Sequence, residues 1–168
     1  MLPQFEMIVQ LVTLTALIAG ILFGILELRR AAKLRAEKAA LDVFNITVQR
    51  EVMDALTLVL NLPRDAAPDH VQSSADLRRA AELVMNLYEY WGIMVYYRVV
   101  PLRTLDLLVG GVVRGSWERL HAFVEWERDA TDIPVRAEWF QWLADRLKEY
   151  PQPEKQVGAH VAFAAWKP

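Results

Sequence analysis

Residues 7–35 read MIVQLVTLTALIAGILFGILELRRAAKLR, and this stretch changes abruptly from apolar to basic. Its first twenty residues, 7–26, contain no charged side chain. At about 1.5 Å of rise per residue, a helix of this length spans about 30 Å, the thickness of the hydrocarbon core of a bilayer. A buried helix of a small soluble domain normally carries a polar stripe, and this one has none. We therefore predict a transmembrane anchor over residues 1–28.

A cleaved secretory signal is the main alternative for this segment. The N-terminal residues MLPQFE contain no Lys or Arg, and no A-x-A-like cleavage site precedes the basic residues. The apolar run is also longer than the core of a signal peptide. These features favour an anchor that is retained.

The flanks of the span predict its orientation. Glu6 is the one charged side chain before the span. Five cations follow it within ten residues: Arg29, Arg30, Lys33, Arg35 and Lys38. Cytoplasmic flanks are enriched in Lys and Arg, which also interact with anionic lipid headgroups. We therefore predict a single-pass membrane protein with its N-terminus outside and its C-terminal domain in the cytoplasm.

The rest of the chain is large enough for one domain, and its charge argues against nucleic acid as a partner. From residue 39 onward there are 14 Lys and Arg against 18 Asp and Glu. A mildly acidic domain lacks the basic surface that binds phosphate backbones. The chain has no cysteine, which excludes disulfides, cysteine-bound zinc and thiol catalysis.

Apolar residues spaced three or four apart predict an all-α fold. Residues 29–62 contain no Gly or Pro, so we expect the membrane helix to continue as one helical stalk up to Pro63. A small cytoplasmic helical bundle should follow over residues 63–150. Its expected helices cover about residues 74–100, 104–109, 112–129 and 136–149. The tail, 151–168, should be loosely ordered unless Phe163 and Trp166 dock.

Two tryptophans and two glycines predict how the bundle packs. Trp91 and Trp117 lie at the centres of the strongest apolar stripes, so we expect each to be buried against the other's helix. Gly111 and Gly115 share one helix face, which would permit a close helix crossing. Residues 91–113 are also apolar, but Arg and Asp side chains and a proline within them favour core helices over a second span.

Two groups of polar residues resemble metal sites. Glu118 and His121 form a single E-x-x-H pair, which would share one helix face and suits a metal-dependent enzyme. A di-iron bundle needs two such pairs, so an ordinary surface contact is the simpler interpretation. The acidic residues from Glu125 to Asp132 are typical of a solvated face, with a weak cation site as the open alternative. We predict no catalytic residue, no metal and no cofactor.

Two other features predict interaction. Ala16, Gly20 and Gly24 recur every four residues, as in membrane helices that pair through small residues. Three apolar stalk residues repeat every seven positions, in register for a two-stranded contact: Leu34, Leu41 and Val48. Tyr90 and Tyr97 should lie outside the core stripe and be partly exposed, where core packing with anchoring hydroxyl groups is the simpler interpretation and a partner surface is the alternative. These features predict membrane lipid, a homodimer through the span and an unidentified protein as partners.

The order of four segments resembles an uncharacterised bacterial family of small membrane-anchored helical proteins, defined by a domain of unknown function. The segments are LYEYWGIMV, PLRTLDLLVGG, SWERLHAFVEWERD and AEWFQWLADRLKEY, and together they cover about residues 77–150. The resemblance implies bacterial origin, a helical fold and a membrane anchor, and it brings no catalytic residues. We therefore expect a non-enzymatic, membrane-tethered interaction module, with a membrane-bound metal enzyme using Glu118 and His121 as the alternative.

Overall fold

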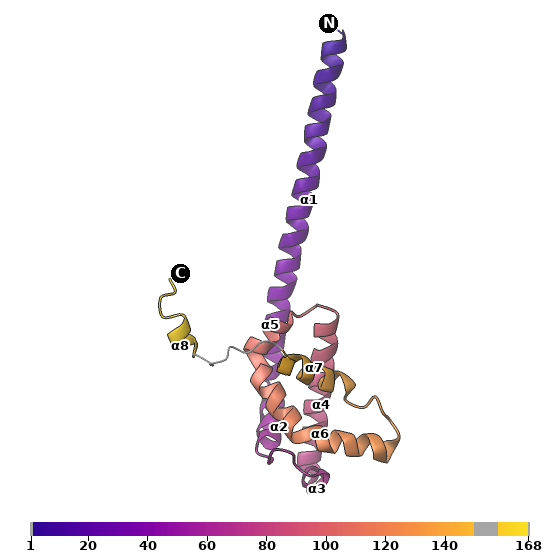
Figure 1. Ribbon diagram of the computed structural model, residues 1–168, viewed down its shortest axis with the longest axis vertical. Helices are drawn as coiled ribbons and strands as arrows, with labels where there is room; N and C mark the ends of the chain where they lie inside the picture. The colour runs from indigo at the N-terminus through magenta and orange to yellow at the C-terminus, as the bar shows by residue number, and fades with distance from the viewer. Residues whose placement is uncertain (1, 150–157, 168) are drawn as a thin grey trace.

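The computed structural model describes residues 2–149 and 158–167, and within these residues it contains helices and no strand. The α-helices are α1 (Leu2–Thr47), α2 (Arg50–Leu60), α3 (Pro68–Gln72), α4 (Ala75–Tyr96), α5 (Leu102–Leu105), α6 (Gly111–Thr131), α7 (Glu138–Glu149) and α8 (Ala159–Ala162). One π-helical segment, η1 (Asp106–Gly110), joins α5 to α6. Figure 1 shows α1 as a long rod that projects from a bundle made by α2 to α7. The predicted all-α fold is confirmed.

Between residues 10 and 28, α1 makes no contact that would bury it. Its large apolar side chains between Leu11 and Leu28 are 43–73% exposed. Helix Gln10–Thr47 is long and apolar enough to cross a membrane, by length and composition. The apolar surface of this helix is therefore left without a protein partner.

The expectation of one rod up to Pro63 is wrong, because α1 ends at Thr47. Gln49 adopts an extended conformation, with φ −61° and ψ 140°, and α2 begins at Arg50. The reason is packing: α2 buries one face in the bundle, where it lies against α4 and α6. A straight continuation of α1 would leave that face in water. Only the end of α1 joins the bundle, through the buried Ala39 and Val43.

Helix α4 forms the centre of the bundle, between α2 and α7 (Figure 1). Tyr88 and Trp91 of α4 are each 1% exposed, which confirms the predicted stripe. Helix α7 crosses α4 at Gly92, where an added Cβ would lie 2.9 Å from the Cβ of Trp139. This close crossing is possible only without a side chain at residue 92.

The expected burial of Trp117 against α4 is wrong, and of the two glycines of α6 only Gly115 lies close to another helix. Trp117 is half-buried and packs edge-on against Phe140 of α7, at 5.1 Å between ring centroids, rather than against α4. Gly111 has nothing within 4 Å of its Cβ position, whereas a Cβ at Gly115 would lie 3.3 Å from a methyl group of Leu60 in α2 and 3.6 Å from Arg119 Nη1. Helix α6 contacts α7 and α2 more extensively than it contacts α4.

The helical backbone that leads into α6 begins before Gly111, earlier in the chain than the sequence suggests. The glycines at 110 and 111 do not break the chain's helical course, which runs from α5 through η1 into α6. Within this turn Arg114 Nη1 donates to Asp106 Oδ1 at 2.7 Å, which fixes the junction. Helix α6 ends at Thr131, and the capping residue Asp132 has a φ of 55°, in the left-handed region typical of helix termini.

The C-terminal tail is described from residue 158. Phe163 and Trp166 are 68% and 71% exposed, so neither docks on the bundle. The part of the expected loose tail before Gly158 lies outside the described residues.

Candidate functional site

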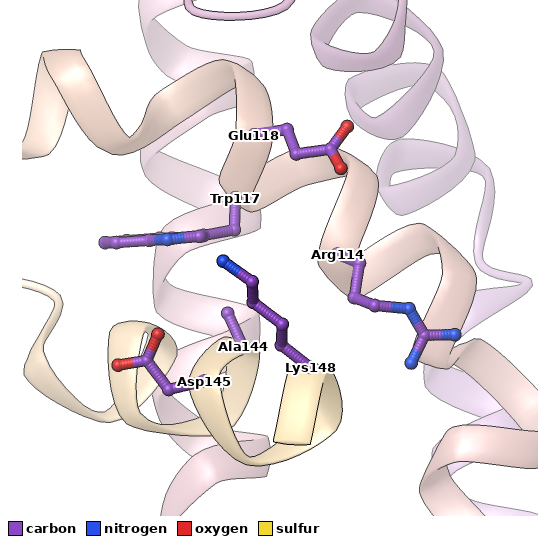
Figure 2. A pocket seen from close by; sticks show the side chains of 6 residues that line it. All are labelled: Arg114, Trp117, Glu118, Ala144, Asp145 and Lys148. Atoms are coloured by element: carbon purple, nitrogen blue, oxygen red, sulfur yellow. The ribbon is translucent and has the colours of Figure 1, made fainter. Parts of the chain in front are cut away.

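A cleft between α6 and α7 combines charged and aromatic side chains. It has a volume of about 180 Å³, and Figure 2 shows the side chains around it. Its lining residues are Arg114, Trp117, Glu118, Ala144, Asp145 and Lys148. This volume lies below the range of typical small-molecule pockets, about 300–1,000 Å³.

Several charges of the cleft already have partners. The Arg114 guanidinium is bound to Asp106 and also donates to the carbonyl oxygen of Leu147 at 3.4 Å. The Glu118 carboxylate pairs with Arg64 at 3.3 Å. The Lys148 and Asp145 side chains both come from α7 and lie on the same side of the Trp117 ring (Figure 2).

The E-x-x-H pair of α6 holds the loop between α2 and α3. Glu118 contacts Arg64, and His121 Nε2 lies 3.7 Å from Asp65 Oδ1. The backbone N–H of Asp65 also donates to the carbonyl oxygen of Glu118 at 2.8 Å. The two side chains thus face different partners on one loop. Among the described residues, no group of three His, Cys, Asp or Glu is arranged to hold a metal ion.

The acidic segment Glu125–Asp132 is not a uniform solvated face, which corrects that interpretation. Glu127 is 7% exposed, and its carboxylate accepts from Arg136 Nε at 3.0 Å. Arg128 donates to the carbonyl oxygen of Arg136 and to Gln141, each at 2.8 Å. This network fixes the loop from α6 to α7, and the fixed loop sets the angle at which α7 crosses α4.

Glu89 is a structural residue that sequence reasoning missed. Its Oε1 accepts from the backbone N–H of Phe140 at 3.0 Å, so it caps the N-terminus of α7 from α4. Burial raises the pKa of the Glu89 carboxyl, while the N–H groups of Phe140 and Trp139 oppose the shift. No local signal marks this role, because Glu89 and Phe140 are 51 residues apart.

Three buried polar atoms in the core have no hydrogen-bond partner among the described residues: Tyr88 Oη, Trp91 Nε1 and Ser116 Oγ. Burial raises the pKa of the Tyr88 phenol, and the neighbouring Ser116 hydroxyl opposes this only partly. The phenol therefore stays protonated near neutral pH and is unsuited to act as a base.

Exposed aromatic side chains gather where α4 ends beside α7. Tyr90 and Tyr97 are 44% and 70% exposed, as their positions on the helix predict. Tyr97 belongs to a larger group, the aromatic patch, formed by Tyr96, Tyr97, Trp139 and Trp142. The Tyr96 and Trp139 rings are 4.9 Å apart. The sequence alone did not join residues 96–97 to 139–142, because the contact depends on the α4–α7 crossing.

The proposed interaction residues of α1 are all free of the bundle. Added Cβ atoms at Gly20 and Gly24 would meet nothing within 4 Å. The five basic residues lie between the apolar segment and the bundle, with Arg30 paired to Glu27 and Lys33 to Glu37 in exposed contacts. Such exposed pairs are weak, so the flank keeps its basic character.

Comparison with known proteins gives one match. The model of a family described as a domain of unknown function (DUF4760) matches residues 14–147. The match begins inside the apolar segment and ends near the end of α7, so it includes α1 as well as the bundle. No curated protein and no solved structure matches the chain.

Proposed function

The chain belongs to the family of this domain of unknown function (DUF4760), and from that premise we propose that it is a non-enzymatic, membrane-tethered interaction module. Its bundle would bind a second copy or a protein partner and hold it at the membrane.

The observation that carries this proposal is the exposure of α1. Eleven large apolar side chains from Leu11 to Leu28 face outward, with no other element covering them. Burying such surface stabilises by about 25 cal/mol per Å², so a lipid environment is strongly favoured over water. The family match extends into this segment, which supports treating α1 and the bundle as one functional unit.

The basic flank supports an orientation with the N-terminus outside and the bundle in the cytoplasm. The five cations follow the apolar segment on the side of the bundle, and the positive-inside tendency places that side in the cytoplasm. We place the anchor in the bacterial inner membrane, because the family resemblance implies bacterial origin and a membrane anchor and the basic flank favours a cytoplasmic bundle.

Self-association along α1 is the interaction that the geometry favours. The bundle packs on the side of α1 that carries Ala39 and Val43. Leu41 is two residues from each, about 200° around the helix, and it is 62% exposed. Leu34 is 65% exposed and lies on nearly the same line, seven residues earlier. Two copies would therefore meet along this line, continuous with the Gly20–Gly24 face, without a clash between bundles.

The aromatic patch supports a protein partner as well. Tyr and Trp are enriched among residues that dominate binding energy, and here the exposed Tyr96 and Tyr97 pack with the half-buried Trp139 and Trp142. The alternative of a metal-dependent enzyme gains no support from the contacts of Glu118 and His121, which both serve the α2–α3 loop.

Two experiments test the proposal. Membranes washed with alkaline carbonate should retain the full chain, whereas a variant lacking residues 1–28 should be released. Release of the full chain would overturn the tether.

Crosslinking in native membranes tests the self-association. The double variant Gly20→Ile/Gly24→Ile should lose the dimer band, because bulk on this face keeps the helices apart. Thr15→Ile is the matched control, since it adds bulk on the opposite side of the span. Equal dimer signal in wild type and both variants would show that the span is an anchor alone.

A further inference from the structure

The end of the bundle nearest to the apolar segment of α1 is formed by the turn from α4 to α5, residues 97–101. Figure 1 shows this turn at the end from which α1 emerges, and α3 at the opposite end. From Leu28 to Ala39, where α1 enters the bundle, the helix rises only about 16 Å. Any membrane that holds the apolar segment would therefore face this turn.

The turn exposes a combination of side chains that suits a lipid headgroup layer. Tyr97 is 70% exposed and Val99 is 45% exposed, while the neighbouring Val100 is 1% exposed and fixes the turn to the core. Arg98 and Arg103 are exposed and have no acidic partner within the part of the chain that the structure describes. Tyrosine, arginine and a small apolar residue are typical of the interface of a bilayer.

The backbone of the turn gives no local reason for arginine at residue 98. Its φ of 57° is left-handed, a position that glycine fills at the least conformational cost. Hydrogen bonds from Arg98 N to Val95 O and from Val99 N to Met94 O, both 2.9 Å, close the helix there. The side chain is thus held outward at a fixed point rather than on a loose loop.

The end of the bundle at this turn differs in charge from the rest of the domain. The chain from residue 39 onward is acidic, with 14 basic against 18 acidic side chains. Near the turn, however, Arg98 and Arg103 follow the basic flank of α1, and the nearby Asp106 is paired with Arg114. The basic end would face the membrane, and the acidic remainder would point away from it.

We propose that the α4–α5 turn docks on anionic phospholipid headgroups and so holds the bundle at a fixed angle against the membrane. This inference rests on the proposed tether, since α1 brings the turn to the surface. Docking would also leave the far end of the bundle, with α3, directed toward the cytoplasm.

The absence of cysteine makes a site-specific test straightforward. Single variants Val99→Cys, Ser73→Cys and Leu28→Cys of the full chain are labelled with a fluorophore and reconstituted in nanodiscs whose lipid headgroups carry a spin-label quencher. Ser73 follows α3 at the far end of the bundle, so a label there gives the quenching expected of a site that does not touch the membrane. Leu28 reports insertion of α1 itself.

With about 30% anionic lipid, we expect the label at 99 to be quenched at least about twofold more than the label at 73. Neutral lipid, high salt or the change Arg98→Gly/Arg103→Gln should abolish that difference, because the attraction is electrostatic. The control change Arg79→Gln, at the other end of α4, should leave it intact.

Equal quenching at 99 and 73, with strong quenching at 28, would overturn docking while leaving the tether in place. Quenching at 99 that is unaffected by lipid charge or by Arg98→Gly/Arg103→Gln would also overturn it. Absence of quenching at 28 would overturn the tether, and docking with it.

Discussion

Replacing Gly92 with alanine should destabilise the bundle by forcing α4 and α7 apart. An added Cβ would lie 2.9 Å from both the carbonyl carbon and the Cβ of Trp139, and closer still to its carbonyl oxygen. Carbon atoms in contact normally stay about 3.5–4.0 Å apart, so α7 must move by close to 1 Å. The closest atoms belong to the Trp139 backbone, which cannot move aside by changing rotamer as a side chain can.

The expected magnitude follows from what that movement disturbs. Overpacking a core typically costs about 1–3 kcal/mol. The shift also strains the hydrogen bond of 3.0 Å from Phe140 N to Glu89 and the contact of 5.0 Å between the Tyr88 and Phe140 rings. Alanine gains about 1 kcal/mol over glycine in a helix, which offsets part of this loss. We expect a net decrease of about 2 kcal/mol in the free energy of unfolding.

Gly111→Ala provides the matched control. It makes the same change in a helix where nothing lies within 4 Å of the new Cβ, so it should stabilise by about 0.5–1 kcal/mol. Tryptophan fluorescence during guanidinium unfolding of the full chain in detergent measures both, because all six tryptophans lie at residue 91 or beyond and α1 is silent. If Gly92→Ala proved as stable as Gly111→Ala, the close crossing would be wrong.

Three further predictions concern the bundle and the span. Glu89→Gln keeps an acceptor for the Phe140 N–H but removes the buried charge. Because the raised pKa of Glu89 makes the folded state bind more protons than the unfolded state, wild type should gain stability relative to Glu89→Gln as the pH falls from about 7 to about 5. An equal difference in the free energy of unfolding between the two proteins at both pH values would contradict this. Trp91→Ala should lower the free energy of unfolding by about 3–5 kcal/mol and the half-buried Trp117→Ala by about half of that, so equal losses in the same fluorescence assay would refute the assigned packing. A reporter active only in the cytoplasm, fused after Glu149, should be active in wild type and weakened when Arg29, Arg30, Lys33 and Arg35 are neutralised, whereas activity of an export-dependent reporter there would reverse the orientation.

Local periodicity determined the helical character of the chain and much of its core. The twenty uncharged residues 7–26 predicted the long apolar helix, and steps of three and four placed Tyr88 and Trp91 inside. These features could be predicted from the sequence because each depends on neighbours within a few residues along one helix. The exposure of Tyr90 and Tyr97 followed from the same period.

Only the tertiary structure decided where the helices break and what each polar residue does. Residues 29–62 hold no Gly or Pro, yet the rod ends at Thr47 because α2 must turn to bury its apolar face. Glu89 caps a helix 51 residues away, and Glu118 and His121 hold a loop rather than a metal. Gly92, rather than Gly111, marks the close crossing. Each of these depends on contacts between distant segments, which form only after the helices pack, so no local pattern encodes them.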